Sequence, residues 1–394
     1  DGSVIAAGMT NEGKLEANPS GTAKLNITAT GSLQSAGQVL AYGDVSLSGS
    51  GIDLQHSQTA SQTGSLSLTA REGDINTSNA VISSPGNISI SANQHTGQGL
   101  INQSGNIRGN SLRLQFKSLD NSIGTIAQTG HTQLDIDLEG GTFDNSQGLL
   151  VNKGNVSVQA SKVINQQGTI GSQTGSVNIS SRTGGINNTQ GLISAQQQLV
   201  LQTNGAGLTN TNTTDAQHRY GIQAGGSANI QSGALDNSTG YINAKGLTVT
   251  AASVNNISGW VLSNSNTTLS SASLDNRRGQ WLSVGDMGLK IDNLDNSSQG
   301  SIRSAGALSL QADGAFNNAT GELSATTDIS IDAWKANTPS LSIDNSGGVL
   351  KSDGSMRIKA SKLKGSGSVE SGTQAKASGL VSRQAIALEF ARDM

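Results

Sequence analysis

The chain has 394 residues, a formal net charge of -3, 3 prolines and no cysteine, and 3% of its residues are aromatic whereas 51 are glycine. So few large side chains argue against two or three ordinary globular domains, and so little charge and proline argue against disorder. The composition also excludes disulfides, and the sequence shows neither a basic stripe for nucleic acid nor an apolar run that would span a membrane.

Along the chain, one short phrase recurs: an apolar residue, Asp or Asn, Asn, two further residues and Gly. It is loose in residues 1–100 and regular from about 100 to 350, where its period is mostly 19 to 24 residues. A fixed period of this length indicates a repeat architecture. The repeated asparagines are Asn121, Asn145, Asn165, Asn188, Asn237, Asn256, Asn276, Asn296 and Asn318, with further anchors at 102 and 345.

Each repeat unit contains short runs that alternate apolar and polar residues, such as 148–151 and 155–160. Period-two alternation predicts half-buried strands, and two or three such strands fit one turn of a coil. We therefore expect an all-β fold, a right-handed parallel β-helix with coils of roughly 20 residues, over residues 1–360.

The phrase predicts the corner of each coil. In a stack of coils, an Asn side chain can donate to the neighbour on one side and accept from the neighbour on the other, which builds an amide ladder. The apolar residue before it should point inward. We expect the Gly to supply a positive φ where the chain enters the next strand.

Residues 204–234 interrupt the rhythm and lack a clean anchor. They predict either a degenerate coil or a coil with a protruding loop, and loops on a rigid scaffold often carry recognition. The candidate binding residues of this segment are His218, Arg219 and Tyr220.

Two aromatic residues follow the repeat glycine directly, in consecutive coils. Tyr241 and Trp260 are expected to face outward and to stack about 5 Å apart, either as a binding pair or as a surface ladder that stiffens the sheet. Trp281 lies one position later in its unit and is expected in the core. The tail, 361–394, changes composition, and Ile386 and Phe390 lie four apart, so we expect a linker with a short helix, a cap or the start of the next domain.

Candidate chemistry is sparse. Asp135, Asp137 and Glu139 share one strand face, which predicts a solvated face rather than a calcium site. We expect no acidic companions around residues 357–359, Arg-Ile-Lys, and the four histidines do not recur in register. We expect no catalytic residues, no metal and no cofactor, and an enzyme acting on polysaccharides is a remote alternative.

The Leu-Asp-Asn-x-x-Gly phrase and the Gly-x-Leu-x-Leu-x-Ala run resemble the filamentous haemagglutinin repeats of two-partner secretion exoproteins. That family includes Gram-negative adhesins, haemolysins and CdiA-type effectors of contact-dependent growth inhibition. The resemblance implies a secreted, cell-surface stalk that is a monomeric rod, presents a distal adhesive or toxin-delivery region, and needs an outer-membrane secretion partner. The alternative is that this segment itself binds a receptor protein or a glycan.

Overall fold

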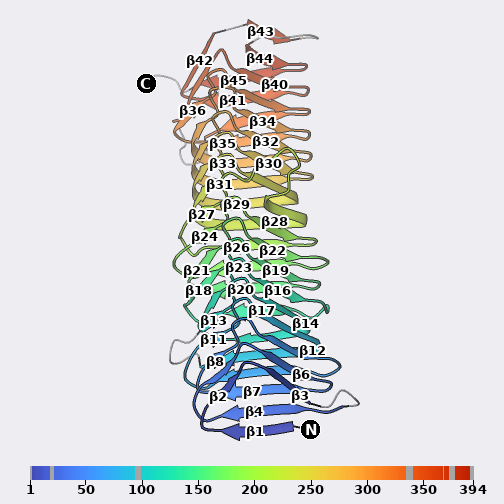
Figure 1. Cartoon of the computed structure of the whole chain (residues 1–394). Helices are drawn as coiled ribbons and strands as arrows, with labels where there is room; N and C mark the ends of the chain where they lie inside the picture. The colour runs from blue at the N-terminus through green and yellow to red at the C-terminus, as the bar shows by residue number, and fades with distance from the viewer. Residues whose placement is uncertain are drawn as a thin grey trace. The chain divides into compact units, whose positions relative to one another are not determined.

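The computed structural model describes residues 2–17, 22–93, 99–333, 340–366, 368–371 and 378–390. Every regular element in these ranges is a β-strand (Figure 1). The chain divides into two compact units, residues 1–198 and 199–394. In the described ranges, no helix has the length and apolar character needed to cross a membrane. His95 and residues 372–377 and 391–394 of the predicted tail lie outside the described residues.

Unit 1 contains β1 Gly2–Ala6, β2 Met9–Asn11, β3 Lys14–Ala17, β4 Leu25–Ala29, β5 Leu33–Ser35, β6 Gln38–Ala41, β7 Val45–Gly49, β8 Ile52–Asp53, β9 Gln58–Ser61, β10 Leu66–Ala70, β11 Ile75–Asn76, β12 Val81–Ala92, β13 Gly99–Ile101, β14 Asn106–Gln115, β15 Ser118–Asp120, β16 Thr125–Gln128, β17 Leu134–Asp137, β18 Thr142–Asp144, β19 Leu149–Asn152, β20 Val156–Ala160, β21 Lys162–Ile164, β22 Thr169–Ser172, β23 Val177–Ser181, β24 Ile186–Asn187 and β25 Leu192–Ala195.

Unit 2 contains β26 Leu199–Gln202, β27 Leu208–Thr209, β28 Gly221–Asp236, β29 Tyr241–Asn255, β30 Trp260–Ser263, β31 Thr267–Asp275, β32 Gln280–Ser283, β33 Met287–Asp295, β34 Ser301–Ser304, β35 Leu308–Gln311, β36 Ala315–Asn317, β37 Glu322–Ala325, β38 Ile329–Asp332, β39 Ser342–Ser346, β40 Val349–Ser352, β41 Met356–Ala360, β42 Lys362–Ser366, β43 Ser368–Ser371, β44 Gly379–Ser382 and β45 Ile386–Phe390.

In both units a strand pairs in parallel with its equivalent in the next coil. In unit 1, β16 pairs with β19 and β19 with β22, which places Ile126, Leu150 and Ile170 in one inward column. In unit 2, β32 pairs with β34 and β34 with β37, and the matching column holds Trp281, which is 1% exposed. The predicted all-β parallel solenoid is thereby confirmed.

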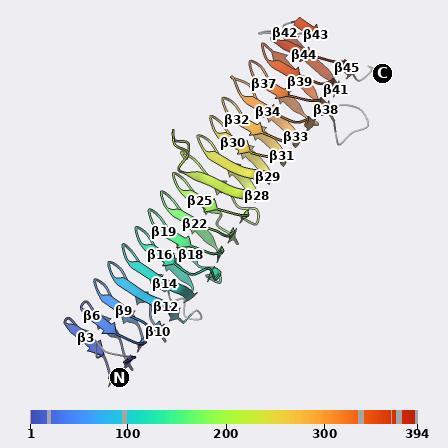
Figure 2. The same cartoon turned by 90° about the vertical axis from the view of Figure 1, so that its right-hand side faces the viewer.

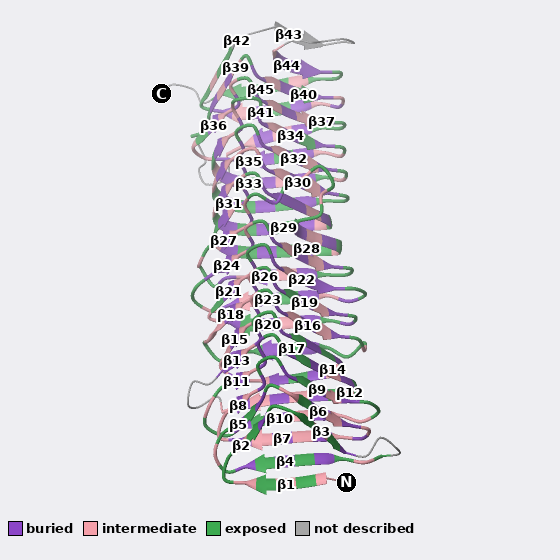
Figure 3. Ribbon diagram, viewed as in Figure 1, coloured by how far each residue is buried: buried purple, intermediate pink, exposed green. Residues whose placement is uncertain are grey.

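The core of each unit is a narrow stack of aliphatic side chains. Buried and exposed residues alternate along most strands (Figure 3), because successive side chains of a strand point to opposite faces. The apolar residues two positions before the repeat Asn, such as Leu119 and Phe143, are fully buried. A core this thin needs few large residues, which explains the low aromatic content.

An amide ladder runs through one corner of the coils. In unit 1, Nδ2 of Asn102 donates to Oδ1 of Asn121 at 2.7 Å, and the same bond recurs through Asn145, Asn165 and Asn188. In unit 2, it recurs at 2.6–2.8 Å through Asn210, Asn237, Asn256, Asn276, Asn296, Asn318 and Asn345. These side chains are buried.

The corner itself corrects one expectation. The positive φ belongs to the residue before the glycine, as at Ile123, whose φ is 59°. Gly124 is required by space instead, because a Cβ there would lie 2.1 Å from the carbonyl oxygen of Asn102 in the neighbouring coil. The Asp before the ladder Asn closes the turn: Asp120 accepts the backbone N–H of Ser122 at 2.9 Å.

The helix expected in the tail is absent from the described residues. Residues 379–382 form β44, which pairs with β40, and residues 386–390 form β45, which pairs with β41. The four-residue spacing of Ile386 and Phe390 fits a strand equally well, since Leu388 lies between them at period two. Residues 386–390 form a strand rather than a helix because β41 provides an edge with which their backbone can form hydrogen bonds.

Candidate functional site at the 211–220 insertion

Region 204–234 is a complete coil turn with an inserted segment. With β26, which precedes it, the turn comprises β27 and most of β28, and the inserted residues 211–220 project before β28 (Figure 2). Asn210 belongs to the ladder, because its Nδ2 donates to Oδ1 of Asn237 at 2.7 Å. This anchor does not fit the sequence pattern, because Thr209 replaces the usual Asx and the following Gly221 is eleven residues away instead of three. The part of the repeat phrase that is kept here is Leu208, the buried apolar residue two positions before Asn210.

Thr213 repairs the corner that the insertion breaks. It occupies the position of the repeat glycine, three residues after Asn210, and it is buried. Elsewhere the glycine N–H donates to the ladder Asn carbonyl, and the glycine carbonyl accepts from the next coil, as Gly240 accepts from Trp260. At the insertion, the Thr213 hydroxyl donates to the carbonyl of Asn210 at 3.3 Å and accepts from the N–H of Tyr241 at 2.8 Å. One hydroxyl therefore replaces both backbone hydrogen bonds of the missing glycine.

The insertion covers the first member of the predicted aromatic pair. The ring of His218 stacks on Tyr241, with centroids 4.4 Å apart and planes at 11°, and it lies 5.8 Å from Trp260. Tyr241 and Trp260 are register partners on β29 and β30. Tyr241 is nevertheless only 5% exposed, so the expectation that it faces solvent is wrong, whereas Trp260 is half-buried. Burial raises the pKa of the Tyr241 phenol above its usual value, and a hydrogen bond to Asn243 opposes this shift.

The inserted segment is braced by its own contacts. Nε of Arg219 donates to the carboxylate of Asp215 at 2.8 Å, and this hydrogen bond lowers the pKa of Asp215 and raises that of Arg219. The amide of Gln223 donates to the carbonyls of His218 and Tyr220 at 2.7 and 2.9 Å. The Arg219 guanidinium lies 5.6 Å from the Tyr220 ring centroid. His218, Arg219 and Tyr220 therefore lie in one cluster with Tyr241 and Trp260.

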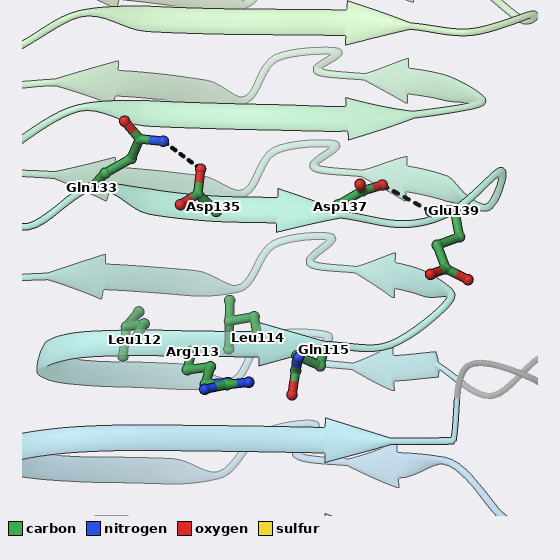
Figure 4. Close-up of a pocket in the computed structure, with 8 residues that line it drawn as sticks. All are labelled: Leu112, Arg113, Leu114, Gln115, Gln133, Asp135, Asp137 and Glu139. Atoms are coloured by element: carbon green, nitrogen blue, oxygen red, sulfur yellow. Dashed lines mark hydrogen bonds between the residues drawn. The ribbon is translucent and has the colours of Figure 1, made fainter.

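The acidic trio lies elsewhere, beside an opening between β14 and β17 in unit 1 (Figure 4). β17 pairs with β20 but not with β14, and the opening holds about 390 Å³. Asp135 and Asp137 are exposed, and Asp137 pairs with Arg182 at 3.0 Å. Nowhere in the described ranges do three or more His, Asp or Glu side chains form a group that could hold a metal ion.

The coil beside the opening is longer than the one that follows it. The step from Asn121 to Asn145 is 24 residues, against 20 for the next step. The side chain of Gln128 bridges part of the gap: its Oε1 accepts the N–H of Leu112 at 2.8 Å, and its Nε2 donates to the carbonyl of Thr132 at 2.6 Å. A side-chain amide therefore stands in for one missing strand bond.

The Arg-Ile-Lys triplet does have acidic companions, contrary to the sequence-based expectation. Arg357 lies 3.9 Å from Asp332 and 3.6 Å from Glu389, and Lys359 lies 3.4 Å from Glu389. The neighbours come from β38 and β45, which flank β41 in space but are distant in sequence. These contacts are ion pairs on the outer face, where each carboxylate is engaged by a cation.

Comparison with known proteins gives a consistent result. Residues 2–112 match the description "Filamentous haemagglutinin family outer membrane protein", and residues 174–218, 205–293, 282–334 and 340–386 match "Haemagglutinin repeat". The toxin CdiA of Yersinia pestis is 34% identical over 125 residues, which are 32% of this chain and 4% of that protein. The chain thus spans a small part of the length of this curated relative. No solved structure matches.

The repeat matches extend over more than half of the chain, and they coincide with the coils that carry the unit 2 ladder. The period, the ladder and the matches agree, and the chain belongs to the filamentous haemagglutinin family.

Proposed function

We propose that this chain is a structural spacer in a large secreted bacterial surface protein, which presents a distal adhesive or toxin-delivery region for contact between cells. One observation supports this most strongly: a buried asparagine bonds each coil to the next throughout the regular part of each unit. The buried polar side chains therefore bond one coil to the next. Such a stack can act through its length and its outer surface rather than through an enclosed pocket.

The family adds the setting for this proposal. Filamentous haemagglutinins imply a two-partner secretion system and a secreted or cell-surface location. We expect an outer-membrane transporter as the secretion partner. The whole protein is either an adhesin or an effector of contact-dependent growth inhibition, and the relative named as a toxin favours the second.

A spacer tolerates the loss of a whole coil. Deleting residues 146–165 joins Asn145 to Gln166, Gln167 and Gly168, which restores the Asn-x-x-Gly corner. We expect the full-length exoprotein with this deletion to fold, to be displayed and to retain its adhesion or growth-inhibition activity. The reach then falls by one coil, about 4.8 Å.

The matched control removes half a coil, residues 146–155. This deletion turns every later side chain out of register with the ladder, so we expect loss of display and loss of β-sheet circular dichroism. Intact display with lost activity after the whole-coil deletion would show that this coil does more than set a distance, and the spacer proposal would fail.

A second candidate function is that the segment itself binds a receptor protein or glycan. The observation that favours it is the cluster of His218, Arg219 and Tyr220 over Tyr241 and Trp260, at the place where the repeat is interrupted.

A further inference from the structure

Apolar side chains gather on the outer surface of unit 2 beside the insertion. Trp260 and Leu262 lie two residues apart on β30, and Leu282 is the register partner of Leu262 on β32. All three are half-buried, and Val284 in the following turn is 57% exposed. We call the surface formed by Arg219, Tyr220, Trp260, Leu262, Leu282 and Val284 the insertion face.

The insertion face continues into a groove of about 420 Å³. Leu262, Leu282 and Val284 line one part of it, and Arg303 and Lys351 line another. Arg303 is paired with Glu322 at 2.6 Å. The groove is therefore apolar where it begins at the insertion face and charged further along.

Arg219 adds a directional polar group to this face. Its Nε is taken by Asp215, and its two terminal amino groups have no hydrogen-bond partner among the residues that the structure describes. Its side chain is 64% exposed. A guanidinium in this state can bind a carboxylate through two parallel N–H bonds. Tyr220, which is 39% exposed, lies beside it.

We propose that the insertion face binds a protein partner that presents apolar side chains next to a carboxylate. Tyr, Trp and Arg are the residues that contribute most at protein interfaces, and this chain has few aromatics to place. A glycan is the weaker fit, because the aliphatic side chains of Leu262, Leu282 and Val284 offer a sugar neither a ring to stack on nor a hydrogen bond. This inference rests on the second candidate function and is independent of the spacer role.

The insertion is built to hold its shape before a partner arrives. Thr213 bonds its base to the ladder, Gln223 holds the carbonyls of His218 and Tyr220, and His218 rests on Tyr241. A segment fixed in this way loses little conformational entropy on binding. Thr213 and His218 are therefore positioning residues, whereas Arg219, Tyr220 and the apolar side chains make the contacts.

The test measures binding of the full chain to outer-membrane vesicles from the strain that encodes it, by biolayer interferometry. We expect saturable binding that is lost when the vesicles are treated with proteinase K. Tyr220→Ser and Arg219→Gln should each weaken it at least tenfold. Tyr220→Ser changes an exposed side chain, so its circular dichroism and melting temperature should match those of the unchanged chain. Arg219→Gln also removes the bond to Asp215, so Tyr220→Ser is the deciding variant.

Matched controls replace the same residue types elsewhere. Tyr42→Ser in unit 1 and Arg277→Gln in unit 2 should leave the affinity unchanged. The proposal is overturned if the vesicles show no saturable binding, if Tyr220→Ser binds as well as the unchanged chain, or if binding survives proteinase K, which would indicate a glycan or lipid. Deletion of residues 146–165 leaves this face intact, so failure of the spacer proposal is distinguishable from failure of this one.

Discussion

At the scale of single residues, the ladder asparagines contribute more than a polar surface group can. The buried amide of Asn256, for example, accepts from one neighbouring coil, donates to the other, and also donates to the carbonyl of Gly259, three residues later, at 3.3 Å. A buried polar group without a hydrogen-bond partner destabilises the fold by its full desolvation free energy. Removing one ladder asparagine leaves its former partners in this state.

Replacing one ladder residue should therefore be costly. Asn256→Ala leaves Oδ1 of Asn276 and the carbonyl of Gly259 without this donor, and we expect the free energy of unfolding to fall by about 3 kcal/mol. Guanidinium chloride unfolding measures it. The control is Asn229→Ala, an exposed asparagine on β28, for which we expect a change below about 0.5 kcal/mol. Equal effects in the two variants would contradict a structural role of the ladder.

The turn carboxylates give a pH dependence with a defined sign. Hydrogen bonds from Ser346 and the ammonium group of Lys364 lower the pKa of Asp344 to about 2. A carboxyl group whose pKa is lower in the folded than in the unfolded chain stabilises the fold above its unfolded value, and that contribution disappears as the pH falls toward 2.

We expect Asp344→Asn to be less stable than the unchanged chain at pH 6, and the difference to shrink at pH 2. Urea unfolding at the two values measures this. Asparagine keeps the acceptor of the turn, as Asn317 does at the equivalent position with Ala319 at 3.1 Å, so the substitution removes the charge and the bond from Lys364 but not the turn. A difference that stays constant with pH would assign the effect to packing.

The role of a residue was predictable where the repeat period alone determines it. It was not predictable where steric contact with another coil determines it. The inward residues and the ladder follow from the period. The role of Gly124 does not, because the oxygen that excludes a side chain there belongs to Asn102, in another coil. Tyr241 was misplaced for a related reason: its cover, His218, comes from an insertion whose path the sequence does not specify.

At the scale of elements, the insertion shows how a solenoid accepts extra residues at a corner without losing a bond. The hydroxyl of Thr213 forms the two hydrogen bonds that the backbone N–H and carbonyl of the repeat glycine form in other coils. The sequence predicted an interruption here but not this substitution, since it depends on the position of the Tyr241 N–H in the next coil.

Thr213→Val keeps the branched shape and removes the hydroxyl. We expect the N–H of Tyr241 to exchange with deuterium at least tenfold faster, and the free energy of unfolding to fall by about 1–3 kcal/mol, because a buried donor loses its acceptor. Hydrogen exchange followed by mass spectrometry measures the first effect. Thr214→Val, next to it and exposed, is the control. Unchanged exchange in Thr213→Val would mean that the corner does not need this bond.

At the scale of the whole molecule, a period of about 20 residues was enough to predict the architecture of each unit. The amino-terminal hundred residues, where the phrase is loose, form coils as well: β7 pairs with β4 on one side and β10 on the other. The apolar part of the insertion face could not be foreseen, because Leu262, Leu282 and Val284 become a surface only when coils are set beside one another.

The ladder has one further consequence, because all of its bonds point the same way. Within each unit the Nδ2 of one asparagine always reaches toward the carboxyl-terminal coil, from Asn102 to Asn121 and from Asn276 to Asn296, and the hydroxyl of Thr77 donates to the first of these. A partly formed stack therefore has two different ends. Its carboxyl-terminal end presents an unbonded amide donor, and its amino-terminal end presents an unbonded amide acceptor. A coil that joins either end can therefore complete the ladder in one orientation and one register only.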